Sequence, residues 1–206
     1  RELGHDRSVY APDLPGHGSS DATGAKISVT ELAAAIGDFL DSLRVRAVDV
    51  FGYQLGALLA AELAIARPQQ VRRVMVWGAP CYSPQERAAL LQNVSTPGTR
   101  DDGSDVSEEW QRMLARRGAN VPPAALGEEL GDRLRAGATG TRALSAALEH
   151  PTLERLPLVK QPALVLRLRD EFWDHAPRAR ACRGRMLTVV PGDQRAPRRL
   201  VAADGA

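Results

Sequence analysis

The sequence predicts an α/β protein in which helices connect the strands of a mostly parallel sheet. Short apolar runs rich in β-branched residues alternate with longer runs whose apolar residues recur every three or four positions. The strand at 47–51 is followed within a few residues by an Ala- and Leu-rich helix that has no breaker before Pro68. A loop rich in Pro and Gly, 12–21, precedes this unit. Strands that alternate with helices at this spacing usually pair in parallel.

Length and composition limit the class of protein. The 206 residues are enough for one sizeable core, and 44% hydrophobic with 25% charged residues is ordinary for a globular chain. No apolar run approaches the roughly 18 residues of a membrane span, and no signal-peptide pattern opens the chain. We therefore expect a cytoplasmic protein with no membrane partner. A net charge of +2 without a basic block gives no support for a nucleic-acid partner.

The cysteines give no sign of a metal site or of a disulfide framework. Cys81 and Cys182 lie far apart and show no ligand spacing. No metal and no cofactor are expected, and oligomeric state cannot be inferred from the sequence.

The first half of the chain predicts three strands and two helices. Residues 8–11 are interpreted as a short buried strand, and 28–31 as the Ser-x-x-Glu capping box that begins a helix. The apolar positions of that helix are Leu32, Ala35, Ile36, Phe39, Leu40 and Leu43. A strand at 47–51, a helix at 55–66 and a strand at 71–78 follow.

A change of pattern marks 81–157 as a mostly helical insertion, for which we predict the role of a lid. Its four apolar stripes are Leu90, Leu91 and Val94; Trp110, Met113 and Leu114; Leu126, Leu130 and Leu134; and Leu144, Ala147 and Leu148. The sheet is expected to resume with strands at 162–166 and 186–190, with a short helix at 176–182 between them. The predicted organisation is thus a first part of the α/β core (1–80), a helical lid (81–157) and a second part of the core (158–206).

The turn after the second predicted strand has the form of a nucleophile elbow, Gly-x-Ser-x-Gly, in which a tight corner raises one side chain above the sheet. Here the glycines are Gly52 and Gly56, and the side chain at the corner is Gln54. With the loop at 12–18 and the order of elements, this segment resembles the α/β-hydrolase fold. The resemblance is to the branch of esterases, epoxide hydrolases and haloalkane dehalogenases, and it is strongest at 12–18 and 49–80.

The resemblance implies a set of catalytic positions. The nucleophile position falls on Gln54, the acid position on Asp170, the histidine position on Arg195, and the oxyanion donor is the backbone N–H of Leu55. A neutral amide is not a useful nucleophile, and an arginine that stays protonated is not a base. Hydrolysis by a serine-type mechanism is therefore not expected. Without a base, Asp170 is expected instead to pair with a neighbouring arginine.

Other side chains are assigned as follows. Tyr53, Trp110 and Trp173 are expected to bind a small molecule beneath the lid, with Trp110 alternatively part of the lid core. His17 is expected to serve local packing, and His175 is the histidine that could replace the missing base.

Three functions remain open from the sequence. The first is a hydrolase-family protein with a non-nucleophilic activity such as elimination. The second is a non-catalytic small-molecule-binding pseudoenzyme. The third is a degenerate fragment, because the resemblance implies strands and a His-Gly loop before Arg1, so that the sheet would be incomplete at its N-terminus.

Overall fold

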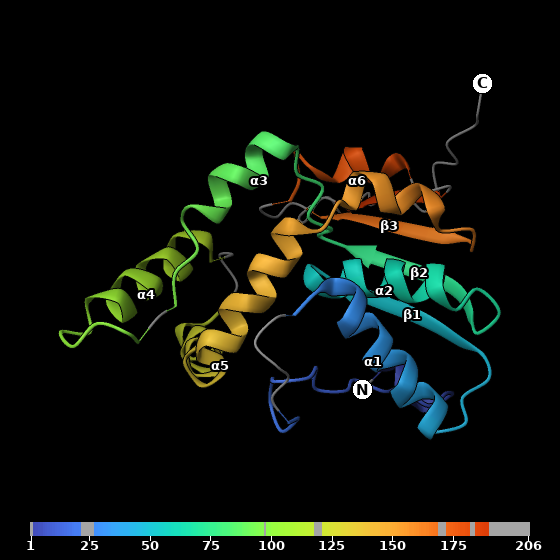
Figure 1. Cartoon of the computed structure of the whole chain (residues 1–206), viewed down its shortest axis with the longest axis horizontal. Helices are drawn as coiled ribbons and strands as arrows, with labels where there is room; N and C mark the ends of the chain where they lie inside the picture. The colour runs from blue at the N-terminus through green and yellow to red at the C-terminus, as the bar shows by residue number, and fades with distance from the viewer. Residues whose placement is uncertain are drawn as a thin grey trace.

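A computed structural model describes residues 2–21, 27–96, 98–117, 121–168, 172–181 and 184–189 (Figure 1). The strands are β1 (Val48–Tyr53), β2 (Val71–Trp77), β3 (Ala163–Leu168) and β4 (Gly184–Val189). The helices are α1 (Val29–Ser42), α2 (Leu55–Ala66), α3 (Pro84–Leu91), α4 (Ser104–Arg116), α5 (Pro123–Glu149) and α6 (Thr152–Arg155), with short 3-10 turns η1 (Glu2–His5), η2 (Leu156–Leu158) and η3 (Ala176–Ala181).

The strands of the described residues form one parallel sheet in the order β1-β2-β3-β4, as the sequence predicts. Tyr53 pairs with Trp77, and Trp77 in turn with Leu166, so the carboxyl ends of these three strands lie together at one end of the sheet. The connection from β1 to α2 begins at this end of the sheet. Ligands of open α/β sheets bind just beyond the carboxyl ends of the strands.

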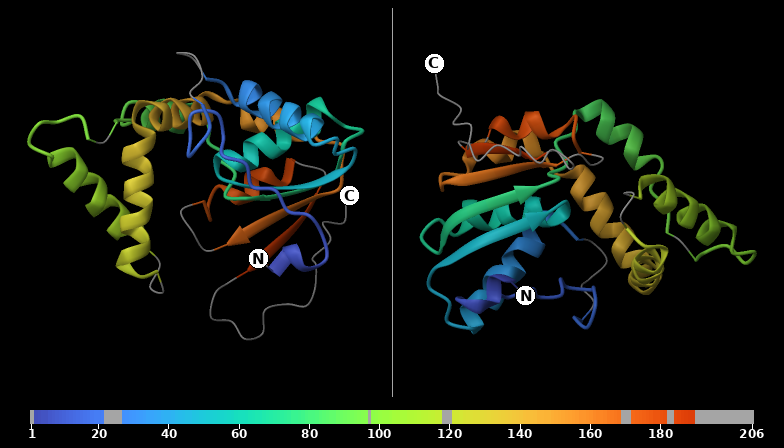
Figure 2. Two further views of the ribbon diagram at one scale, coloured as in Figure 1. Left: turned by 90° about the horizontal axis from the view of Figure 1, so that it is seen from below. Right: turned by 180° about the vertical axis from the view of Figure 1, so that it is seen from behind.

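Helix α2 is buried on every side because it lies between the sheet and two other helices. All eight residues from Ala57 to Ala64 are buried. Its Ala57 and Leu63 belong to the core formed with β2 and β3, whereas Leu58 and Leu59 pack in a second cluster with α1 and α5. Helices α1 and α2 lie side by side on one face of the sheet (Figures 1 and 2).

The beginning of α1 confirms the predicted capping box. Glu31 N–H donates to Ser28 Oγ at 3.1 Å, and Ser28 N–H donates to the Glu31 carboxylate at 2.9 Å. These contacts satisfy backbone groups that a helix start leaves without intrahelical partners.

Three helices, α3 to α5, follow β2, in agreement with the predicted helical insertion. The third and fourth apolar stripes lie in one element, α5, on the two sides of a break at Gly137, where φ is 50° and ψ is −131°. Figure 2 shows the two halves of α5 running in different directions, with α4 and the first half projecting away from the sheet. The second half packs against α1 and α2, where Ala146 and Ala147 join the second core cluster.

The predicted strand at 8–11 is wrong. These residues take no part in the sheet, and Val9 and Tyr10 are 55% and 49% exposed. The Tyr10 ring instead contacts Phe39 of α1 edge-on, at 6.0 Å between centroids. A short segment becomes a strand only where a neighbouring strand accepts its backbone hydrogen bonds, and β1, the edge strand of the described sheet, does not pair with residues 8–11.

Within the described residues, every helix is too short or too polar to span a lipid bilayer.

Candidate functional site

The turn between β1 and α2 is a tight corner with Gln54 at its apex. Gln54 has φ 51° and ψ −115°, a backbone conformation that residues other than glycine rarely adopt. Its N–H donates to the Trp77 carbonyl at 3.0 Å, and its own carbonyl accepts from Ala57 N–H at 3.0 Å. The corner is therefore tied both to the neighbouring strand and to the first turn of α2.

Gly52 makes this corner feasible. A Cβ at Gly52 would collide with the backbone carbonyl of Gly56, because α2 turns back directly against the end of β1. Gly56 is different, since a Cβ there would meet nothing within 4 Å. Of the two glycines that flank Gln54, the first is required by a close approach of backbones and the second is not.

The side chain of Gln54 is oriented by its neighbour. Its Nε2 donates to the Tyr53 hydroxyl at 3.0 Å. The Tyr53 ring in turn lies against Trp77, with 4.3 Å between centroids and 36° between ring planes. An amide held in this way can donate and accept hydrogen bonds, but it supplies neither a nucleophile nor a base.

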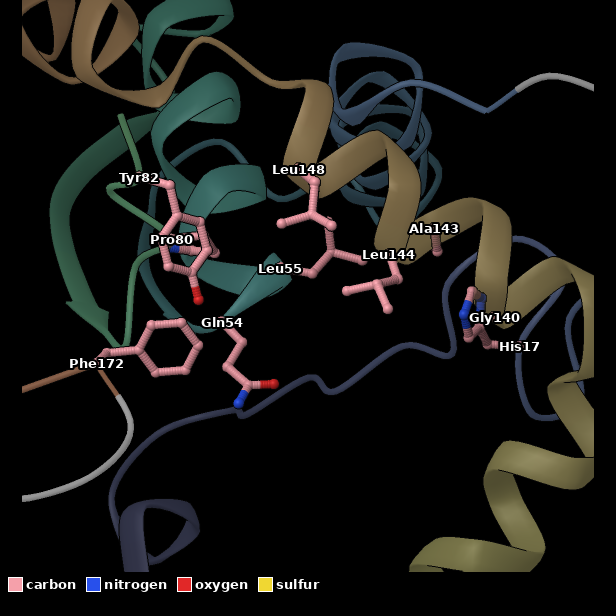
Figure 3. A pocket seen from close by; sticks show the side chains of 11 residues that line it. His17, Gln54, Leu55, Pro80, Tyr82, Gly140, Ala143, Leu144, Leu148 and Phe172 are labelled. Carbon is pink, nitrogen blue, oxygen red and sulfur yellow. The ribbon is translucent and has the colours of Figure 1, made fainter. Parts of the chain in front are cut away.

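A cavity of about 230 Å³ lies beside the corner (Figure 3). It is lined by the start of α2, the segment after β2, the second half of α5, the loop before α1 and the segment after β3. The lining residues are His17, Gln54, Leu55, Pro80, Tyr82, Gly140, Ala143, Leu144, Ala147, Leu148 and Phe172. None of the described residues that line it is Asp, Glu, Lys or Arg, so this part of the wall favours an uncharged, largely apolar ligand.

The structure brings two of the sequence-predicted site residues, Gln54 and Leu55, together in the wall of this cavity. Tyr53, Trp110 and Trp173 are not among its lining residues. Tyr53 lies next to the corner, Trp110 lies in α4, and Trp173 lies beneath the guanidinium of Arg167, whose Cζ is 3.8 Å from the ring centroid. A role in substrate binding for these three aromatic residues stays a prediction.

The other two predicted catalytic positions, Asp170 and Arg195, lie outside the described residues. His175 is described, and it lies at the edge of the Tyr82 ring with 4.8 Å between centroids. Its Nδ1 is 4.0 Å from a carboxylate oxygen of Glu86, a residue of α3.

Several of the cavity residues carry no functional signal in the sequence. Leu144 and Leu148 are apolar stripe residues, and helical spacing alone does not say whether a stripe faces a core or a cavity. His17 was expected to serve local contacts, which it does, because its Nδ1 is 3.2 Å from the Pro15 carbonyl. Its presence in the cavity wall as well follows from the fold and has no local signal.

A buried ion cluster joins α2 to the segment after α5. Glu62 is 2% exposed; Arg155 Nε and Nη2 each donate to its carboxylate at 2.7 Å, and His150 Nε2 lies 2.9 Å from it. Burial alone would raise the pKa of the Glu62 carboxyl, but the hydrogen bonds from Arg155 and His150 outweigh burial and lower the pKa to about 2. The cluster fixes the end of α5, and with it one wall of the cavity, against α2.

In the parts of the chain that the structure describes, no group of three His, Cys, Asp or Glu side chains could hold a metal ion.

A family model described as the alpha/beta hydrolase family matches residues 1–203, and the chain belongs to this family.

Similar proteins include two curated relatives. The chain is 37% identical to the dihydrolipoyllysine-residue acetyltransferase component of the acetoin cleaving system of Cupriavidus necator. This match extends over 67 residues, which are 32% of this chain and 18% of the relative. The chain is also 31% identical to the pimeloyl-(acyl-carrier protein) methyl ester esterase of Salmonella heidelberg. This match extends over 116 residues, which are 56% of this chain and 42% of the relative. The chain thus spans less than half the length of either relative.

Among solved structures, the enol-lactonase of Burkholderia xenovorans is similar with a TM-score of 0.66. The match covers 86% of this chain and 70% of that one at 19% identity, and at this identity it shows the fold alone.

Proposed function

We propose that this chain is an alpha/beta hydrolase-family protein that binds a small neutral molecule beside the corner at Gln54 and forms no covalent intermediate there. The main support for this proposal is that Gln54, whose side chain the corner raises into the cavity wall, carries an amide. Where the attacking group of a catalytic triad is removed, the rate falls on the order of 10⁶-fold in a well-studied case. Arg195 at the predicted histidine position supports the same proposal.

The chemistry of the cavity supports an uncharged ligand. Leucine, alanine and aromatic side chains make up most of the wall that the described residues form, and the polar side chains in that wall are the amide of Gln54, the imidazole of His17 and the hydroxyl of Tyr82. One relative is named a methyl ester esterase and one structural neighbour an enol-lactonase, and both names refer to ester bonds. Small neutral esters are therefore the first ligands to test, with α3 to α5 in the proposed role of a lid.

Three measurements on the wild-type chain test the proposal. A fluorophosphonate probe should leave the protein unlabelled, and p-nitrophenyl acetate and butyrate should be hydrolysed no faster than in buffer. A panel of small neutral esters should include members that raise the melting temperature in a saturable way. Labelling or turnover that is lost in Gln54→Ala would overturn the proposal, because it would place covalent chemistry at the corner.

Gln54→Ser is the matched variant. It restores a hydroxyl at the corner but leaves Arg195 at the predicted base position, so we expect it to remain unlabelled as well. Gln54→Ser labelling at a rate typical of a serine hydrolase would show that a base survives elsewhere in the site.

A further inference from the structure

The loop that carries His17 is held by its own hydrogen bonds. The Asp13 carboxylate accepts from Ser19 N–H at 2.9 Å, and Gly16 N–H donates to the Asp21 carbonyl at 2.8 Å. His17 N–H donates to the Leu14 carbonyl, also at 2.8 Å. These bonds close residues 13–21 into a compact loop, so the backbone position of His17 is set before any ligand arrives.

The tip of this loop abuts α5. Gly16 has φ 76°, and a Cβ at that position would collide with the methyl group of Thr139. This close contact places the neighbouring His17 beside Gly140 in the cavity wall (Figure 3). The imidazole is therefore packed into the wall by contact between two elements that are far apart in the chain.

The hydrogen bond to Pro15 determines the tautomer of His17. A carbonyl oxygen only accepts, so the contact of 3.2 Å between Nδ1 and the Pro15 carbonyl requires the proton on Nδ1. In the neutral ring, Nε2 then has no proton and acts as an acceptor. Among the described residues, no protein group occupies that acceptor.

The two polar ends of the cavity are different. Figure 3 shows Gln54 and His17 at opposite ends, with leucine side chains of α2 and α5 between them. The amide of Gln54 can both donate and accept, whereas neutral His17 can only accept through Nε2. A ligand that spans the cavity would meet an acceptor at the His17 end.

We propose that His17 selects ligands with a hydroxyl or N–H group, by accepting a hydrogen bond at Nε2 from the end of the ligand that lies far from Gln54. The inference rests on the proposed function, because it assigns a ligand class to the same cavity. The ligand is then a small neutral molecule with an apolar middle and a hydrogen-bond donor at one end.

The test compares two esters of one skeleton, methyl 4-(hydroxymethyl)benzoate and methyl 4-(methoxymethyl)benzoate, at pH 8 by NMR titration. The first can donate a hydrogen bond and the second cannot. Wild type should bind the hydroxyl compound about 3- to 10-fold more tightly, the range expected for one net hydrogen bond. His17→Asn should bind both alike, because its side-chain amide keeps a donor for the Pro15 carbonyl but lacks the acceptor at the ring tip. His5→Asn changes an exposed histidine and should keep the wild-type preference.

The outcomes separate this inference from the proposed function. If wild type binds both esters equally well, the role of His17 is wrong and the binding function stands. If wild type binds neither ester, nor any other neutral ester, the binding function fails and the inference falls with it. The ¹⁵N spectrum of the His17 ring gives an independent readout: the free protein should show the proton on Nδ1, and the Nε2 resonance should shift with the hydroxyl compound alone. A proton on Nε2 in the free protein would also overturn the inference.

Discussion

Arg155 holds the buried carboxylate of Glu62 with two parallel hydrogen bonds, from Nε and Nη2, each 2.7 Å long. Glu62 is 2% exposed on its side chain, whereas Arg155 is 34% exposed, so the guanidinium reaches inward from the surface to neutralise an interior charge. The second neighbour, His150, is the residue at which α5 ends. The position of α5 over the cavity therefore depends on a charge in α2 that forms no part of the cavity wall.

Glu62→Gln should destabilise the protein strongly. It replaces the carboxylate that accepts two hydrogen bonds from Arg155 with a neutral amide, and a hydrogen bond to a charged group contributes about 1.5–3 kcal/mol. Glu108→Gln is the matched control, since Glu108 and its partner Arg100 are 56% and 54% exposed and such pairs contribute about 1 kcal/mol or less. Urea denaturation measures the unfolding free energy of both variants. Equal effects of the two substitutions would contradict the structural role of the cluster.

The same carboxylate should make stability depend on acid. Its pKa falls from 4.5 to about 2 on folding, so the unfolded chain takes up this proton at a higher pH than the folded chain does. The ionised Glu62 carboxylate therefore stabilises the folded protein fully above about pH 4.5, and this stabilisation is lost as the pH falls toward 2. The difference in unfolding free energy between wild type and Glu62→Gln should therefore shrink across this range. A difference that stays constant down to pH 2 would show that Glu62 is not selectively ionised in the folded state.

Local sequence patterns predicted most of the elements. The Ser28–Glu31 capping box, the uninterrupted run before Pro68 and the glycine spacing around Gln54 each involve residues a few positions apart, and each is present in the structure. The strand expected at 8–11 failed because pairing depends on a partner strand, which no local pattern describes.

The site was less predictable because its contacts join distant parts of the chain. Glu62 lies 88 positions from His150 and 93 from Arg155. His17 reaches the cavity because its loop packs on α5 through Gly16. A single sequence carries the periodicity of each helix but not the pairing of such side chains, so the charge of Glu62 within an apolar run was the one local hint of a buried partner.

The two glycines beside Gln54 should respond oppositely to alanine. Gly52→Ala forces a methyl group into the backbone of Gly56, and overpacking of this kind costs about 1–3 kcal/mol or more. Gly56→Ala adds a methyl group in open space within α2, where alanine is favoured over glycine by up to about 1 kcal/mol. Thermal melting of the two variants measures the contrast. If Gly52→Ala were as stable as Gly56→Ala, α2 would not turn back against β1 as closely as the structure has it.

The corner itself should carry measurable strain at Gln54. A non-glycine residue held at φ 51° and ψ −115° costs on the order of 1–3 kcal/mol. Gln54→Ala and Gln54→Gly both remove the hydrogen bond to the Tyr53 hydroxyl, but only the glycine variant relieves the backbone. The greater freedom of glycine in the unfolded chain opposes this gain by about 0.4–1 kcal/mol. We therefore expect Gln54→Gly to be the more stable of the pair by about 1 kcal/mol in urea denaturation.

The reverse order, with Gln54→Ala more stable, would mean that the corner is relaxed. Gln54 would then be an ordinary turn residue, and its place in the cavity wall would need no strained backbone to maintain it. The expected order instead implies that the fold accepts a destabilising backbone conformation at the one position where it presents an amide to the cavity. Such strain is found where the surrounding structure fixes a side chain for contact with a ligand, which is the role that the proposed function gives to Gln54.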